Sequence, residues 1–236
     1  MYSDAHVHLD KRMKELLKDE SIEAIISCST PKQCEEAMAF VKQHPQKRMS
    51  CGIHPWQADA ISWEEMLPWL EKSRIIGEIG MDCVWCDCDL QLQKNIFERQ
   101  LAYAHHVQKP VVLHTKGMEK EILEQIKRYP NKYQVHWYSC DEYIEAYRSL
   151  DCYFSIGPFP SIDPNVRKVV EMIPLDHLMI ETDGISAIEW AMGHPLENDA
   201  YLSSLQRIAE EIATIKHREP NEILKIAKHN LLQFIS

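Results

Sequence analysis

Two histidines near the start of the chain, in the stretch MYSDAHVHLD, have a spacing that suits metal binding. Side chains two residues apart point to the same face of a β-strand, so His6 and His8 would project together if this stretch is extended. Such a pair can hold a divalent ion, but it is also common on an ordinary solvated edge. The pair alone leaves both interpretations open.

Further histidines and carboxylates lie at or near the ends of other short apolar segments. These residues are His54, Glu78, His114, His136 and Asp183. In a barrel of parallel strands the C-terminal strand ends form one face, so these side chains would converge on one site. Burying them without compensation would cost several kcal/mol each. Imidazole and carboxylate suit Zn²⁺, Mn²⁺ or a similar ion such as Mg²⁺, and the set exceeds what one tetrahedral ion needs, which predicts two metal ions.

The elements that must position these residues are short β-branched or apolar runs. The predicted strands are residues 2–8, 22–28, 48–54, 75–81, 110–114, 133–138, 152–157 and 178–183. Segments with helical periodicity lie between them, at 37–41, 89–109, 119–129, 166–173 and 202–215. This alternation predicts parallel strands with right-handed crossovers and matches an α/β fold of the (β/α)₈ TIM barrel type. A doubly wound open sheet is the alternative, but no Gly-rich phosphate turn follows the first run.

Composition limits the class of protein. The 236 residues predict a single domain over 1–236, and the last segment, from residue 221, predicts an additional C-terminal helix packed against the outside of the barrel. A net charge of −10 argues against non-specific coating of nucleic acid. Eight cysteines without a signal peptide predict reduced thiols and a cytoplasmic location, and no apolar run approaches a membrane span.

Several segments together resemble a known family. SDAHVHLD, CGIHPW, IGEIGMD, PVVLHTK, VHWYS and MIETDG are similar, in order and spacing, to the signature segments of the TatD family of metal-dependent deoxyribonucleases, members of the amidohydrolase superfamily. The pattern Q-x-x-x-F-x-x-Q formed by Gln93, Phe97 and Gln100 also looks like that family. The resemblance covers essentially the whole chain.

The resemblance implies a (β/α)₈ barrel with two divalent ions. It places His6, His8 and Asp183 on one ion, His114 and His136 on the second, and Glu78 between the two, with His54 near the substrate phosphate. The same residues follow from the strand ends, so we interpret His6 and His8 as metal ligands. The sequence departs from the family at Gly184 and Ile185, where the family usually has Pro after Asp183 and one more residue, at Cys140, which replaces Gly, and at Lys116, which replaces Arg. Substrate identity is therefore less determined than metal binding.

Paired metal ions suit phosphodiester hydrolysis by a metal-activated water, with Asp183 orienting the water and taking its proton and Glu78 as the second catalytic carboxylate. Lys11, Arg12 and Lys116 are candidate phosphate-binding residues, against the alternative of solvated charge. Trp56, and with it Trp85 and Trp137, are candidates for base stacking, against the alternative of core packing.

Two remaining features are expected to be secondary. Cys83, Cys86 and Cys88 offer only three thiolates without a fourth partner, so we expect free thiols. Glu181 shares a face with Asp183 but lies one layer deeper, where it would hydrogen-bond to a ligand and not bind metal itself.

The function predicted first is a metal-dependent deoxyribonuclease or phosphodiesterase acting, as a monomer, on DNA ends or oligonucleotides. A dinuclear site also polarises carbonyl groups, so hydrolysis of an ester or amide bond in a small molecule or an aminoacyl-tRNA is the first alternative. A non-catalytic, metal-stabilised binding barrel is the second.

Overall fold

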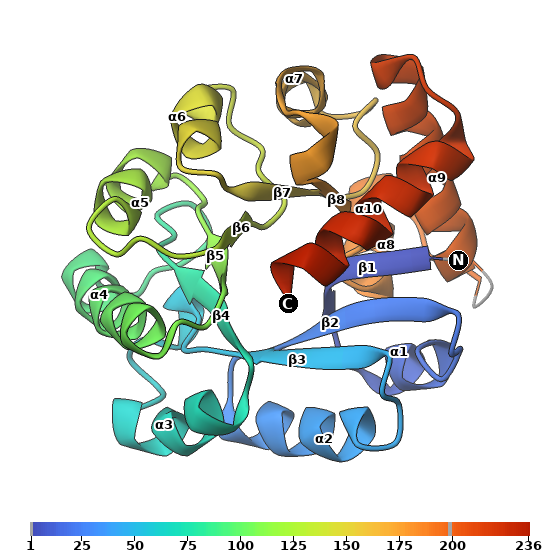
Figure 1. Ribbon diagram of the computed structural model, residues 1–236. Helices are drawn as coiled ribbons and strands as arrows, with labels where there is room; N and C mark the ends of the chain where they lie inside the picture. Colours follow the sequence, from blue (N-terminus) through green and yellow to red (C-terminus); the bar gives the residue numbers. More distant parts are fainter. Residues whose placement is uncertain (1, 198–199) are drawn as a thin grey trace.

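A computed structural model describes residues 2–197 and 200–236, and in it eight parallel strands form a nearly closed barrel surrounded by helices (Figure 1). The strands pair in chain order: β1 (Tyr2–His8), β2 (Ile22–Cys28), β3 (Lys47–Cys51), β4 (Ile75–Gly80), β5 (Val111–His114), β6 (Tyr133–Val135), β7 (Tyr153–Ile156) and β8 (Leu178–Ile180). The predicted TIM barrel is thus confirmed, and all eight predicted runs contain a strand.

Helices and two 3₁₀ turns fill the connections. They are α1 (Lys11–Leu16), α2 (Pro31–Val41), η1 (Pro55–Gln57), α3 (Trp63–Lys72), α4 (Leu90–Val107), α5 (Glu119–Ile126), α6 (Ile144–Ser149), α7 (Pro164–Met172), η2 (Leu175–His177), α8 (Ile185–Met192), α9 (Ala200–Lys216) and α10 (Pro220–Phe234). Helical periodicity did not predict α1, α3, α6 or α8, which have six to ten residues each and so contain few repeats of an apolar stripe, although α5 and α7, of similar length, were predicted.

The first and last strands are joined mainly through one buried carboxylate. Asp4 Oδ1 accepts a hydrogen bond from the backbone N–H of Thr182 at 3.0 Å, and its Oδ2 accepts from the hydroxyl of Tyr201 at 2.8 Å. Burial outweighs these hydrogen bonds and raises the pKa of Asp4 to about 6. Beside it, the N–H of Asp183 donates to the carbonyl of His6 at 3.0 Å. These contacts bring the first and last predicted metal ligands together.

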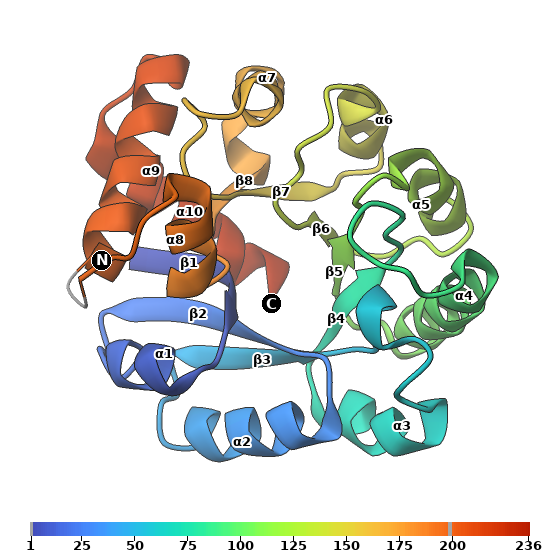
Figure 2. The same ribbon diagram turned by 180° about the vertical axis from the view of Figure 1, so that it is seen from behind.

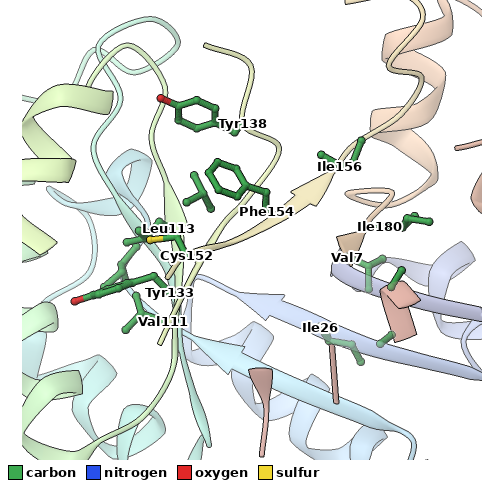
Figure 3. Close-up of a cluster of buried hydrophobic side chains, with 14 of the residues drawn as sticks. Val7, Ile26, Val111, Leu113, Tyr133, Tyr138, Cys152, Phe154, Ile156 and Ile180 are labelled. Atoms are coloured by element: carbon green, nitrogen blue, oxygen red, sulfur yellow. The ribbon is translucent and has the colours of Figure 1, made fainter. Parts of the chain in front are cut away.

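The hydrophobic core has two layers. Outward-facing strand residues, including Val7, Ile26, Val111, Phe154 and Ile180, pack beneath the surrounding helices (Figure 3). A smaller cluster contains Ala5, Ile25, Ile75, Val112, Met179, Leu231 and Phe234. In this second cluster five strand residues meet two residues of α10, so the last helix supplies part of the barrel's own filling.

The position of α10 differs from the expectation that it packs against the outside of the barrel. It crosses the end where the strands begin, with the C-terminus near the centre of the ring (Figure 1). The side chain of Asn230 donates to the carbonyl of Leu178, the first residue of β8, at 2.7 Å. Amphipathic periodicity predicts a buried face but not which surface covers it, so the sequence did not distinguish the two positions. The opposite end of the barrel, seen in Figure 2, stays free of α10 and carries α8.

Removing an α10 side chain from the inner cluster should destabilise the barrel. Phe234 is fully buried, whereas Leu232, two residues earlier, is 37% exposed. We expect Phe234→Ala to lower the free energy of unfolding by about 3–5 kcal/mol, and Leu232→Ala by no more than about 0.5 kcal/mol. Urea denaturation of both variants measures the difference, and equal losses would contradict the packing of α10 inside the barrel end.

Candidate metal centre

The predicted ligands gather at the end of the barrel where the strands end. His6 and His8 lie in β1, Glu78 in β4 and His114 at the end of β5, whereas His54, His136 and Asp183 lie one to three residues beyond their strands. A cavity of about 950 Å³ opens over them, and six of the seven line it: His8, His54, Glu78, His114, His136 and Asp183. His6 is fully buried beneath.

His6, His8 and Asp183 form the first group of converging ligand atoms. The two Nε2 atoms are 3.4 Å apart, and Oδ1 of Asp183 is 3.6 Å from the first and 3.2 Å from the second. A tetrahedral ion with ligand bonds of about 2.1 Å needs ligand atoms about 3.4 Å apart, so the spacing fits a divalent ion. Asp183 has a left-handed backbone (φ 58°), a conformation that Asp tolerates better than most residues.

Glu78 lies at the centre of the site. Its Oε2 is 3.2 Å from Nε2 of His6, and its Oε1 is 2.7 Å from Nδ1 of His114. Oε1 is also 3.4 Å from Nε2 of His54 and 3.7 Å from Nε2 of His136. Burial alone would raise the pKa of this carboxyl, but the surrounding histidines hold it well below its usual range. One oxygen therefore faces each side of the site.

His114 lies between two carboxylates, one of which sequence reasoning missed. Its Nδ1 faces Glu78, and its Nε2 is 2.9 Å from Oδ2 of Asp82. Asp82 is completely buried and also accepts from the indole N–H of Trp56 at 2.7 Å. Burial opposes protonation of His114, but the two carboxylates outweigh it and raise its pKa to about 9. Asp82 is the last residue of the segment IGEIGMD, so its place beside the site was readable, but its partner was not.

His136 has a comparable arrangement with Glu181. Its Nε2 faces Glu78, and its Nδ1 is 2.8 Å from Oε1 of Glu181, without the alignment of a hydrogen bond. The His136 ring stacks on His6 with centroids 3.8 Å apart. Burial raises the pKa of Glu181 well above its usual range. Histidines that bind metal usually have a carboxylate or carbonyl on the other ring nitrogen, which fixes the tautomer, so Asp82 and Glu181 are placed as orienting groups.

His54 has a different hydrogen-bonding pattern. Its Nδ1 accepts from the backbone N–H of Trp56 at 3.2 Å, at the start of η1. Burial lowers its pKa, which favours the neutral ring, and in that ring the proton must then lie on Nε2. Nε2 is therefore a donor, and it lies 3.4 Å from Oε1 of Glu78, beside the cavity that both residues line. Although its atoms lie close enough to Glu78 and His114 to form a ligand group, this tautomer favours hydrogen bonding to substrate.

Two glutamines of α4 fix the loops that carry these side chains. The amide of Gln100 bonds both to the N–H of Ile53 at 2.6 Å and to its carbonyl at 3.0 Å, next to His54. Gln93 does the same for the N–H and carbonyl of Asp82, at 2.8 and 3.1 Å. The Q-x-x-x-F-x-x-Q pattern is therefore a backbone clamp that holds β3 and β4 at their C-terminal ends.

The predicted substrate-binding residues divide into two sets. Lys116 and Trp56 line the cavity, with Nζ of Lys116 donating to the hydroxyl of Ser139 at 3.0 Å. Lys11 is exposed on α1, and Arg12 pairs with Glu189 at 2.7 Å and donates to the carbonyl of Leu196. Neither is among the residues that line the cavity. A substrate role for Lys11 and Arg12 stays a prediction.

The cysteines after β4 are free thiols, as predicted. Cys83 donates to the carbonyl of Gly117 at 3.3 Å and Cys86 to that of Pro55 at 3.6 Å. Among the described residues, the ligand groups that converge closely enough for a metal include no cysteine.

A barrel with histidines and carboxylates at its strand ends is typical of metal-dependent hydrolases, and comparison with known proteins gives the family. The TatD related DNase family matches residues 3–236, so the chain belongs to the TatD family. It is 27% identical over 250 residues to an uncharacterized metal-dependent hydrolase of Methanocaldococcus jannaschii, covering 99% of this chain and 96% of that protein. It is 28% identical to the uncharacterized metal-dependent hydrolase YabD of Bacillus subtilis, covering 98% and 97%.

A solved structure has the same fold as this chain. The crystal structure of YjjV, a TatD homologue of Escherichia coli, superposes with a TM-score of 0.84 at 19% identity, covering 99% of this chain and 97% of that one. The family match and the relatives together show that the chain described in this structure is a metal-dependent hydrolase of the TatD type. Across the described residues, no helix combines the length and apolar character required to cross a membrane.

Asp82 should affect metal binding without being a ligand. Asp82→Asn keeps the shape but removes the charge facing His114, so divalent-metal affinity should fall about 10–100-fold. Asp59→Asn is the matched control, because Asp59 is exposed near the same end of the barrel and has no histidine partner in its hydrogen bonds or ion pairs. Calorimetric titration of metal-free protein measures both, and unchanged affinity in Asp82→Asn would contradict the orienting role.

Proposed function

We propose that the protein is a nuclease that hydrolyses phosphodiester bonds at unpaired ends of DNA or RNA, or in short oligonucleotides. The observation that carries this proposal is Glu78, whose two oxygens face histidines on opposite sides of the site at 3.2 and 2.7 Å. This arrangement would suit a carboxylate shared by two ions. Relatives of 24% identity from Erwinia tasmaniensis and Rahnella are named 3'-5' ssDNA/RNA exonuclease TatD, and a human relative of 26% identity is named a 3'-5' RNA nuclease.

The ligand assignment is the one that the family resemblance implies, and it is supported by the ring nitrogens of His114 and His136 that face Oε1 of Glu78. His6, His8 and Asp183 would hold one ion; His114 through Nδ1 and His136 through Nε2 would hold the second; Glu78 would bridge. The donor set suits Zn²⁺ or Mn²⁺, with Mg²⁺ as a further candidate. When bound, such ions lower the pKa of a coordinated water and offset negative charge on the substrate phosphate.

The remaining chemistry belongs to side chains of the chain itself. Burial opposes ionisation of Asp183, but His8, whose Nε2 lies 3.2 Å from Oδ1, lowers its pKa, so at neutral pH it is a carboxylate. It would accept the proton of the attacking water. Nε2 of His54 would donate to a phosphate oxygen, and the ammonium of Lys116 would pair with the phosphate charge. The cytoplasmic location and the monomeric state stay predictions.

Product analysis tests the reaction. Metal-replete protein should shorten a 5'-labelled single-stranded oligonucleotide and should cleave bis-p-nitrophenyl phosphate, with slower action on the same oligonucleotide in a duplex. Panels of carboxylic esters, amides and aminoacyl-tRNA are run beside it. Turnover confined to the esters or amides would replace the nuclease by the hydrolase alternative, and no turnover of any substrate would favour a binding barrel.

The variants Asp183→Asn and His8→Ala should lose turnover for different reasons. Asp183→Asn should reduce turnover at least 10²–10⁴-fold, the usual scale of lost acid–base help, at every metal concentration. His8→Ala should act mainly through metal loss, so excess Zn²⁺ or Mn²⁺ should restore part of its activity. Turnover is measured against metal concentration, with the unmodified protein expected to bind two equivalents. Near-normal activity of metal-saturated Asp183→Asn would refute this assignment.

A further inference from the structure

Three tryptophans from separate parts of the chain form one wall of the cavity. Trp85 follows β4, Trp137 follows β6, and Trp190 lies on α8. The rings of Trp85 and Trp190 meet edge to face with centroids 6.1 Å apart, and those of Trp137 and Trp190 do so at 6.2 Å. Trp190 is 69% exposed and Trp85 52%. This tryptophan wall (Trp85, Trp137, Trp190) leaves large aromatic surfaces open beside the metal centre.

The wall is held in place at its inner end. Trp137 directly follows the predicted ligand His136 and has a left-handed backbone (φ 36°), which is unfavourable for a bulky residue. Its ring lies against Gly157, where a Cβ atom would come within 2.6 Å of the indole. The backbone geometry and this close approach position the Trp137 ring next to the metal centre, and Trp190 packs edge to face on that ring.

The charge around the cavity limits what the wall can bind. Among the described residues that line it, Lys116 is the single lysine or arginine, whereas Glu119 and Asp163 add negative charge. A long phosphate backbone would find few partners here. The Lys116 ammonium already lies 4.6 Å from the Trp85 ring centre, so a quaternary ammonium ligand would meet a like charge on that face. A neutral, flat aromatic group suits the wall best.

We propose that the tryptophan wall binds an unpaired nucleobase of the nucleotide whose phosphate lies at the metal centre, with Lys116 at the adjoining phosphate. The inference rests on the proposed nuclease function and names how that site selects its substrate. Bases stack on aromatic rings whatever their sequence, so selection is for an unpaired end and not for a base. A paired base has both faces covered by its neighbours and cannot enter.

A substitution on α8 tests the wall without touching the metal ligands. Trp190→Ala should raise KM for a single-stranded oligonucleotide about 5- to 150-fold, the fold-change expected for loss of one stacked base. When the terminal nucleotide of the same oligonucleotide is abasic, Trp190→Ala and the unmodified protein should have nearly the same KM. Trp190→Phe should recover much of the loss. The matched control is Trp69→Ala on α3, where Lys72 lies 4.5 Å from the ring centre, but the residue is outside the cavity.

Binding to metal-free protein separates this inference from the proposed function. Deoxyadenosine monophosphate should quench tryptophan fluorescence and bind more weakly to Trp190→Ala, whereas deoxyribose phosphate should not distinguish the two proteins. If no phosphodiester is cleaved but this difference in nucleotide binding is found, the proposed nuclease function is wrong and nucleobase binding at the tryptophan wall is supported. If phosphodiesters are cleaved and Trp190→Ala changes neither KM nor nucleotide binding, nucleobase binding at the tryptophan wall is refuted and the proposed nuclease function is supported. A Trp190-dependent KM for an aromatic ester, without nucleotide binding, would also refute the nucleobase.

Salt dependence gives an independent measurement. With one lysine at the phosphate, log K for single-stranded oligonucleotide should fall with log salt with a slope of about −0.7, or about −1.4 if a second cation contributes. A slope steeper than about −3 would show that phosphate contacts dominate binding, and would overturn recognition through the base.

Discussion

The structure depends on keeping one buried carboxylate charged. Glu78 is 2% exposed, and four histidines surround it at 2.7–3.7 Å. A carboxylate in such a place without partners would be strongly destabilising, so the histidines that compensate it must come from four other strands or the loops after them. A fold that points several strand ends at one spot meets this requirement, and the TIM barrel does so. The same convergence that keeps Glu78 ionised produces the ligand set.

Closure of the barrel is the second condition. His6 and Asp183 stand at the two ends of the strand order, so they meet only if β1 and β8 adjoin. Asp4 holds that junction through Thr182 and Tyr201, and the latter belongs to α9, outside the barrel repeat. The helices after β8 therefore serve the site indirectly: α9 supports the seam, and α10 fills the opposite end.

Most of the fold and the predicted ligands were readable from the sequence because both depend on local patterns. Strand-length apolar runs followed by His, Glu or Asp identify a barrel with polar strand ends without any knowledge of packing. The contributions that were missed depend on long-range contacts. Asp82 contributes because it contacts His114, 32 residues away, and Trp190 contributes because α8, a helix that the sequence did not predict, places it beside Trp85 and Trp137. No local sequence pattern predicts either of these contacts between residues that are far apart in the chain.

A net charge of −10 is compatible with a nuclease function, because the two kinds of nucleic-acid substrate differ in how much positive charge they require. An enzyme that holds a duplex by its phosphates needs a broad cationic surface, because each phosphate contact contributes counterion release. A cavity that accepted a single unpaired end would need positive charge only where the phosphate reacts, and divalent ions held by the predicted ligands would supply it there. Recognition can then pass to the aromatic surface, whose contribution does not depend on the charge of the rest of the molecule. A net negative charge disfavours contact with a long stretch of phosphate backbone, so only the end of a nucleic-acid strand would enter the cavity.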